Sequence, residues 1–161
     1  MEITRRVLVN VDRCIDCKAC FVACFDGHHG EPIIHHAPGP YGFPILCRQC
    51  EEPTCVAACP YGAMERDPHG VVLRRLPMCR ACWSCVPACP FGAIDAAMVE
   101  RRVAKCDLCE DRVLAGGRPR CVAACPAGAL EFVEVAEADL EQRGLFVIAG
   151  RTLGKDLWRR R

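Results

Sequence analysis

The sequence has few aromatic residues, little net charge and no long apolar segment. Phe, Trp and Tyr make up 6% of the 161 residues, and the hydrophobic 52% includes sixteen cysteines, so little hydrocarbon is left for a core. The formal net charge of +1 argues against nucleic acid as a partner. The longest apolar segment without cysteine, residues 145–149, lies between two glycines and is far below the roughly 18 residues that a membrane span needs.

Targeting and nucleotide-binding motifs are also missing. Arg5 and Arg6 resemble a fragment of a twin-arginine export signal, but Asp12 and Arg13 follow where an apolar segment is required. No glycine-rich loop matches the dinucleotide or phosphate fingerprints. We therefore expect a cytoplasmic protein that neither inserts into the membrane nor binds nucleic acid. In that compartment a disulfide framework is disfavoured, and metal binding is favoured.

What the sequence has in abundance is cysteine, arranged in four groups of four with none left over. The first and third groups have the spacing C-x2-C-x2-C-x3-C, the second has a middle gap of four residues, and the fourth has a middle gap of eleven. The groups are Cys14, Cys17, Cys20 and Cys24; Cys47, Cys50, Cys55 and Cys59; Cys79, Cys82, Cys85 and Cys89; and Cys106, Cys109, Cys121 and Cys125. Such internal repetition indicates one structural unit used several times.

The repeat extends beyond the cysteines. Groups two, three and four all close with Cys-Pro-x-Gly-Ala, beginning at Cys59, Cys89 and Cys125, whereas Cys24 of group one is followed by Phe25. A proline directly after the cysteine cannot continue a helix, so the chain changes direction there.

Two kinds of metal site compete to explain this pattern. A C-x2-C-x2-C loop is able to wrap three corners of a [4Fe–4S] cluster, and in two-cluster ferredoxins the fourth cysteine ligates the other cluster. Zinc also takes four cysteines, and group four alone resembles a zinc finger. The x2-x2 spacing and the repeated pentad favour four iron–sulfur clusters in two interlocked pairs. The alternative is a zinc-binding structural or interaction protein.

Between the cysteine groups the sequence predicts only short elements, and hence a loop-rich α+β fold. Strands are expected ahead of groups one and three and after each pentad, at residues 6–11, 70–74, 63–65, 93–95 and 129–133. Single helical turns are expected at residues 56–59, 86–89 and 122–125. Beyond them we expect an amphipathic helix at residues 135–143, a short apolar strand after Gly144 and a basic tail at residues 151–161.

Several residues outside the cysteine groups are also candidates for a functional role. Residues 25–44 predict a surface loop whose histidines (His28, His29, His35 and His36) are expected to be exposed or to contact a partner. Trp83 is expected to shield a cluster from water or to pack on a neighbouring unit. The basic tail either docks on a partner or a second copy, or is a solvated end.

Basic residues also gather around group four: Arg101, Arg102, Lys105, Arg112, Arg118 and Arg120. They would raise the reduction potential of a nearby cluster, form a solvated face or contact an acidic partner.

The order and spacing of the four groups resemble one family over residues 3–133. It comprises the four-cluster iron–sulfur subunits of the dimethyl sulfoxide reductase, nitrate reductase and formate dehydrogenase type. The compact length is most similar to the small subunits that serve tungsten-dependent aldehyde oxidoreductase, hydrogenase or carbon monoxide dehydrogenase.

The resemblance implies which cysteines share a cluster. Cluster 1 would take Cys14, Cys17, Cys20 and Cys125; cluster 2, Cys24, Cys106, Cys109 and Cys121; cluster 3, Cys47, Cys50, Cys55 and Cys89; and cluster 4, Cys59, Cys79, Cys82 and Cys85. One ferredoxin-like unit would then comprise residues 1–46 and 95–133, the second would comprise residues 47–94, and residues 134–161 would form a C-terminal extension.

The resemblance also implies the function. We expect no catalytic residues and no enzymatic activity, but an electron-transfer subunit that relays single electrons between a catalytic oxidoreductase subunit and a second redox partner. Tungsten-dependent aldehyde oxidoreductase is the first choice for the catalytic partner. The alternatives are a hydrogenase, carbon monoxide dehydrogenase or formate dehydrogenase complex.

Overall fold

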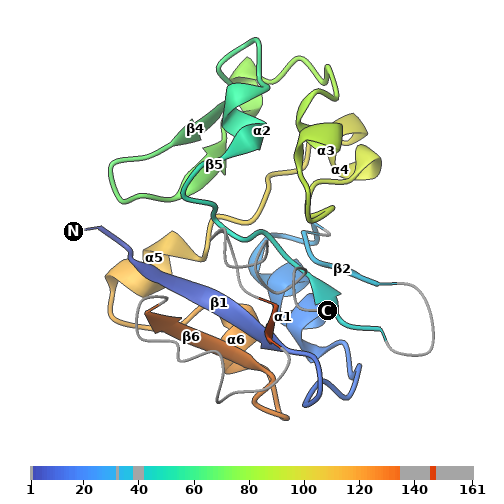
Figure 1. The fold of residues 1–161 in the computed structure, drawn as a ribbon, viewed down its shortest axis with the longest axis vertical. Helices are drawn as coiled ribbons and strands as arrows, with labels where there is room; N and C mark the ends of the chain where they lie inside the picture. Colours follow the sequence, from blue (N-terminus) through green and yellow to red (C-terminus); the bar gives the residue numbers. More distant parts are fainter. Residues whose placement is uncertain (1, 32, 38–41, 135–145, 148–161) are drawn as a thin grey trace, which may run out of the picture.

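The structure is a computed structural model that describes residues 2–31, 33–37, 42–134 and 146–147. Short strands and short helices are joined by long loops, which confirms the loop-rich mixture of α and β structure (Figure 1). In chain order the elements are β1 (Arg5–Asn10), α1 (Ala19–Gly27), β2 (His35–His36), β3 (Pro44–Ile45), α2 (Thr54–Ala57), β4 (Met64–Arg66), β5 (Val72–Arg74), the 3₁₀ helix η1 (Leu76–Met78), α3 (Cys85–Ala88), α4 (Ala96–Glu100), α5 (Glu110–Leu114), α6 (Arg120–Ala123), β6 (Leu130–Glu134) and β7 (Phe146–Val147).

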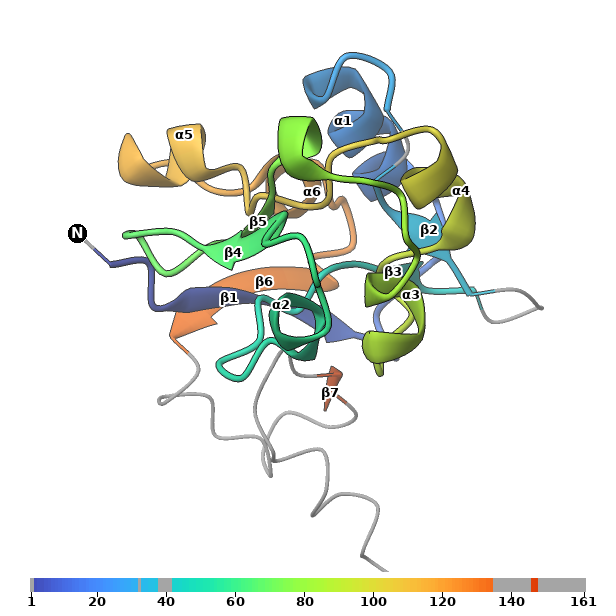
Figure 2. The ribbon, with the colours of Figure 1, turned by 90° about the horizontal axis from the view of Figure 1, so that it is seen from above.

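Strand β1 is the centre of an antiparallel sheet with the order β6–β1–β7. Val7 pairs with Phe132, so the strand before the first cysteine group and the strand after the last group lie side by side (Figure 2). Val9 pairs with Val147 on the other edge. The predicted strands at residues 6–11 and 129–133 and the apolar strand after Gly144 are therefore confirmed, with small shifts at their ends.

A hairpin of β4 and β5 forms a second sheet, in which Met64 pairs with Arg74. The Asp67 carboxylate accepts hydrogen bonds from the amides of His69 (2.9 Å) and Val71 (2.8 Å), which closes the turn. Gly70 takes a φ of 81°, a value that side chains disfavour. This hairpin confirms the two strands predicted on either side of the turn.

The strand predicted at residues 93–95 is wrong. Asp95 instead begins α4, and its carboxylate accepts a hydrogen bond from the Met98 amide at 2.8 Å. An aspartate that caps a helix N-terminus satisfies an amide that has no partner within the helix. Ala93 and Ile94, whose apolar character predicted a strand, are instead buried residues that directly precede this helix.

The three predicted helical turns are present as α2, α3 and α6, but they begin two, one and two residues earlier than predicted. α2 and α6 start directly after Pro53 and Pro119, whose fixed φ suits the beginning of a helix. Each turn ends within two residues before the cysteine of its Cys-Pro bond, because the residue before a proline is disfavoured in the helical region. Cys89, for example, has a ψ of 107°.

The predicted surface loop at residues 25–44 is only partly correct. α1 continues to Gly27, β2 lies within the segment, and Ile33 and Ile34 are buried. α1 and α5 (Glu110–Leu114) were both missed, because the cysteine spacing there masks the usual helical periodicity. The predicted helix at residues 135–143 and the tail at residues 151–161 lie outside the described residues.

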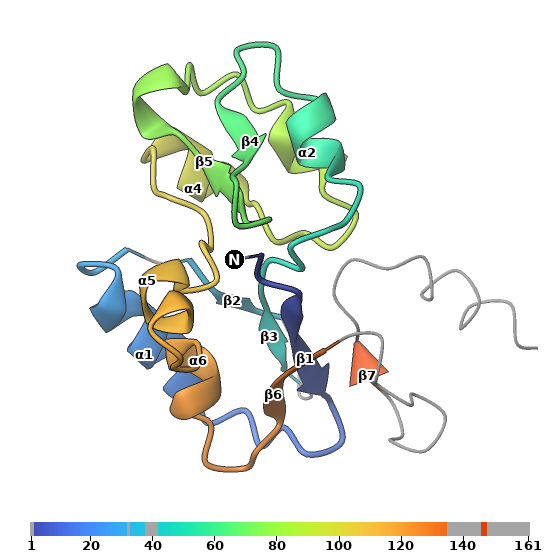
Figure 3. The same ribbon diagram turned by 90° about the vertical axis from the view of Figure 1, so that its left-hand side faces the viewer.

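Figure 3 shows the described chain as two halves. One half contains α2, α3, α4 and the β4–β5 hairpin, with a small core that includes Met64, Val72 and Val99. The other contains β1, β6, α1, α5 and α6 around a larger core that includes Leu130 and Phe132. Within the described residues, no helix has the length and apolar character needed to cross a bilayer.

Candidate metal centres

Three small cavities are each lined by four cysteines that come from two different groups. One is lined by Cys14, Cys17, Cys20 and Cys125; the next by Cys47, Cys50, Cys55 and Cys89; and the third by Cys59, Cys79, Cys82 and Cys85. We call these sets quartets 1, 3 and 4, since they are the sets that the family resemblance implies for clusters 1, 3 and 4.

The remaining cysteines, Cys24, Cys106, Cys109 and Cys121, gather where α1 packs against α6, and we call them quartet 2. Burial raises the pKa of Cys106 well above its ordinary value, and Cys47, Cys121 and Cys24 raise it further through their charges. Burial also raises the pKa of Cys109, to which Cys24 contributes. Such mutual electrostatic effects require the four sulfurs of quartet 2 to be neighbours.

The loops that present the cysteines share one backbone feature. The residue just before the second cysteine of each group has a left-handed conformation, with φ of 53° at Asp16, 49° at Gln49, 53° at Ala81 and 62° at Leu108. Non-glycine residues adopt this conformation at a cost of roughly 1–2 kcal/mol. The loop thereby turns sharply, and in groups one, two and three its first two cysteines face the same cavity.

Amide groups donate hydrogen bonds to some of these sulfurs. The amide of Ala129, which ends the last pentad, donates to Cys125 Sγ at 3.2 Å, and the amide of Arg120 donates to Cys109 Sγ at 3.5 Å. Hydrogen bonds to cysteine sulfur are one of the means by which a protein sets the reduction potential of an iron–sulfur cluster.

In the free protein the buried thiols favour their neutral form. Burial raises the pKa of Cys20 and of Cys55 to about 11, and that of Cys121 still further. Thiolates at these positions need a compensating positive charge, which a bound metal supplies.

Buried cations also face the quartets. Arg48 lines the cavity of quartet 3 and lies over the Phe91 ring, with 4.9 Å from Cζ to the ring centroid. Burial lowers its pKa to about 10, which the charges of Cys50 and Cys47 oppose. Arg74 lines the cavity of quartet 4. Within the described residues, the Nε and Nη1 atoms of both arginines are buried without a hydrogen-bond partner.

Four thiolates and a buried guanidinium with two N–H-bearing nitrogens left without a hydrogen-bond partner around one cavity fit an anionic group such as a thiolate-bound iron–sulfur cluster. A lone zinc ion fits less well, because it requires sulfur ligands that converge to about 2.3 Å from one point. In the described part of the chain, no three His, Cys, Asp or Glu side chains are arranged to hold a single ion.

The histidines lie closer to the cysteines than predicted, and only His29 is exposed as expected. His28 Nδ1 lies 3.6 Å from Cys24 Sγ, and its Nε2 lies 3.2 Å from Asp107. His36 Nε2 lies 3.8 Å from Cys20 Sγ. The contact of His28 is local, because His28 caps the C-terminus of α1 four residues after Cys24. The contact of His36 depends on the return of the loop toward α1, which residue spacing does not encode.

The basic residues around group four do not form one patch. Arg101, Arg102, Arg112 and Arg118 are exposed. Arg120 contacts α1, since a Cβ added at Gly27 would lie 2.1 Å from Arg120 Cδ. Lys105 is buried.

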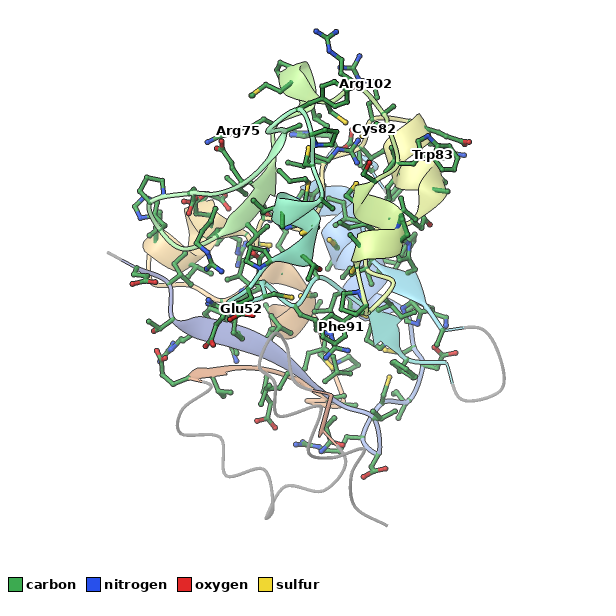
Figure 4. The ribbon with its side chains drawn as sticks, turned by 45° about the horizontal axis from the view of Figure 1, so that its top comes forward. Glu52, Arg75, Cys82, Trp83, Phe91 and Arg102 are labelled. Carbon is green, nitrogen blue, oxygen red and sulfur yellow. The ribbon has the colours of Figure 1, made fainter. Side chains whose placement is uncertain are left out.

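Trp83 lines the cavity of quartet 4 beside Cys82 and is 41% exposed, a position that suits the predicted shielding of a cluster (Figure 4).

Fold and site together define a class: a small carrier of several thiolate-bound metal clusters. The chain matches the family described as "4Fe-4S dicluster domain" over residues 40–135 and the one described as "4Fe-4S binding domain" over residues 11–25.

Among curated relatives, the "Formate dehydrogenase, nitrate-inducible, iron-sulfur subunit" of Escherichia coli is 33% identical over 175 residues, covering 85% of this chain and 60% of the relative. The B subunit of the anaerobic dimethyl sulfoxide reductase of Escherichia coli is 33% identical over 161 residues, covering 88% and 78%. The protein of the same name from Haemophilus influenzae is 31% identical, covering 78% and 72%.

The chain therefore belongs to the 4Fe-4S dicluster family, with the iron–sulfur subunit of formate dehydrogenase and the B subunit of dimethyl sulfoxide reductase as relatives. It spans less than two thirds of the formate dehydrogenase subunit's length. Its cofactors are four [4Fe–4S] clusters, in line with its sixteen cysteines.

Proposed function

We propose that this chain is the electron-transfer subunit of an oxidoreductase complex, and that it relays single electrons through clusters 1, 2, 3 and 4 in that order. The observation that supports this most directly is the gathering of sixteen cysteines into four neighbouring quartets. When bound, each cluster takes up and releases one electron. The cysteines and the surrounding backbone hold the clusters and set their potentials.

We assign the ligands quartet by quartet, as the family resemblance implies. In this assignment the fourth cysteine of each group ligates the partner cluster, which interlocks groups one and four as one unit and groups two and three as the other. Two contacts favour this division: β1 pairs with β6, and α2 packs against α3. The units would comprise residues 1–46 with 95–133, and residues 47–94.

The order of the relay follows from which quartets are neighbours. Cys20 of quartet 1 raises the pKa of Cys121 of quartet 2 through its charge, after burial as the main cause. Cys47 of quartet 3 does the same to Cys106 of quartet 2. Quartets 3 and 4 meet where the packed helices α2 and α3 present cysteines of both. A linear path through all four quartets results.

The two ends of this path are the most accessible. Of the sixteen cysteines, only Cys17 in quartet 1 and Cys82 in quartet 4 are exposed. Exposed apolar residues accompany both ends: Ile15 beside Cys17, and Trp83 beside Cys82 (Figure 4). Apolar groups on a polar surface mark contact sites for other proteins. We infer that the catalytic subunit and the second redox partner dock at these two ends.

The named relatives favour a catalytic subunit of the formate dehydrogenase or dimethyl sulfoxide reductase kind. They lend no support to the first choice from sequence, tungsten-dependent aldehyde oxidoreductase, nor to hydrogenase or carbon monoxide dehydrogenase. A cytoplasmic location, the identity of the second partner and self-association through the C-terminal tail stay predictions.

The test is anaerobic purification of the full chain, followed by metal analysis and a redox titration. We expect about sixteen iron atoms per chain. We also expect four one-electron centres that reduce and reoxidise reversibly, without turnover of formate, aldehyde, CO or H₂ by the chain alone. Zinc as the main metal, or catalytic turnover without a partner, would overturn the proposal.

A further inference from the structure

Lys105 lies between the two halves of the molecule, directly before Cys106 in the chain. Its side chain is buried, and its ammonium donates hydrogen bonds to the backbone carbonyls of Val72 and, at 2.9 Å, of Cys106. Val72 belongs to β5 and the smaller core, whereas Cys106 packs against the larger core. One buried ammonium therefore joins backbone from both halves.

Gln49, which is 1% exposed, joins the same two halves of the molecule. Its amide nitrogen donates to the Cys106 carbonyl at 2.8 Å, and its amide oxygen accepts from the Val72 amide at 2.7 Å. Lys105 and Gln49 thus bind the backbone of the same two residues. With both side chains buried and hydrogen bonded, the ammonium is held in one place.

The hydrogen bonds of Lys105 place its charge next to two quartets. Val72, whose carbonyl accepts one of these bonds, lines the cavity of quartet 3 together with Cys47 and Cys55. Cys106, whose carbonyl accepts the other, belongs to quartet 2. Burial keeps solvent and salt from screening these interactions.

We propose that Lys105 is a fixed positive charge that assists electron transfer between clusters 2 and 3. It raises the reduction potentials of both clusters, so that the two clusters in the middle of the relay accept electrons more readily. This inference rests on the proposed four-cluster relay. A fixed positive charge next to a cluster stabilises the extra electron of the reduced state. Because Lys105 faces both quartets, its effect is shared by two clusters and not confined to one.

The other cations have different positions. Arg48 lines the cavity of quartet 3, and Arg74 lines the cavity of quartet 4. Arg101 is exposed four residues before Lys105, so solvent screens its charge. Arg101 is therefore a matched control that removes one positive charge from the same segment without touching a quartet.

The experiment compares the wild-type holoprotein with K105M, K105R and R101M in potentiometric titrations followed by electron paramagnetic resonance. In K105M we expect two of the four potentials to fall. The equilibrium preference for the reduced form should drop about tenfold at each, which corresponds to about 59 mV for a one-electron centre. K105R should restore most of the loss, and R101M should leave all four potentials at their wild-type values.

Unchanged potentials in an iron-replete K105M protein would overturn the proposal, as would a shift of one cluster only or an equal shift of all four. If K105M loses iron, the number of iron atoms lost shows whether Lys105 acts at two clusters. Loss of about eight iron atoms, with K105R replete, supports a shared role at two clusters, whereas loss of about four or of all sixteen contradicts it. A wild-type protein without four one-electron centres would refute the relay itself, independently of Lys105.

Discussion

At the scale of single residues, the central feature is the fourth cysteine of a group: in groups two, three and four it lines a cavity with cysteines of another group. Cys125 of group four lies with Cys14, Cys17 and Cys20 of group one. Cys24 of group one lies instead with group four, where His28 connects it to Asp107. In the proposed assignment, this exchange of ligands joins distant parts of the chain through the clusters.

The exchange predicts a crossed result for two substitutions. C24S should damage cluster 2, and C125S should damage cluster 1, although each residue belongs by sequence to the other group. The measurement is the iron content together with the electron paramagnetic resonance signal of each cluster, with about four iron atoms affected in each variant. Damage by C24S confined to the cluster of Cys14, Cys17 and Cys20 would contradict the exchange.

Trp83 offers a second test at this scale, because it lines the cavity of quartet 4 beside the exposed Cys82. In W83A we expect cluster 4 to be destroyed by air faster than in the wild type, while the other three clusters persist. The rate of loss of visible absorbance, and the iron that remains after a fixed exposure, measure this. W83F keeps an aromatic ring over the cavity and should behave like the wild type. Equal rates of cluster loss in W83A and W83F would contradict the shielding role.

At the scale of elements, the cysteine loops stand out because their left-handed residues are not glycine. Ala81 has a φ of 53°, whereas Ala88 ends the helical turn α3 only seven residues later. A loop held in a costly conformation is maintained by its surroundings, here by the ligands that flank it. The same alanine-to-glycine change should therefore have opposite effects at the two positions.

For A81G we expect a free energy of unfolding that is unchanged or higher by up to about 1 kcal/mol, since glycine relieves the left-handed strain. For A88G we expect a decrease of about 0.5–1 kcal/mol, because glycine weakens a helical turn. Denaturant titrations of both holoproteins give the comparison. Destabilisation of A81G as large as that of A88G would show that the loop is not strained.

At the scale of the whole molecule, the two apolar cores are small, and several of their members are cysteines. Metal ligation must supply much of the stability of such a chain, because free energy of metal binding becomes free energy of folding. We expect removal of iron by an anaerobic chelator to abolish the cooperative unfolding transition and much of the circular dichroism. Return of iron and sulfide should restore both, and an apoprotein that unfolds cooperatively would contradict this dependence.

The sequence was sufficient for everything that depends on spacing. The sixteen cysteines in four groups predict the cofactor class and number, and the Cys-Pro-x-Gly-Ala pentads predict where each helical turn stops. Gly62, Gly92 and Gly128 of these pentads all take positive φ values near 60°, which explains why the same residue recurs there. Local chemistry fixes such features, because each depends on only a few neighbouring residues.

Only the tertiary structure decided the features that depend on contacts between segments far apart in the sequence. Spacing did not show that Asp95 begins a helix, that His36 turns inward to Cys20, or that Lys105 alone among the basic residues around group four lies buried between two quartets. A side chain's burial and charge partners are set by elements far away in the sequence, such as β5 for Lys105. Local pattern therefore determined what this chain binds, and packing determined which charges surround it.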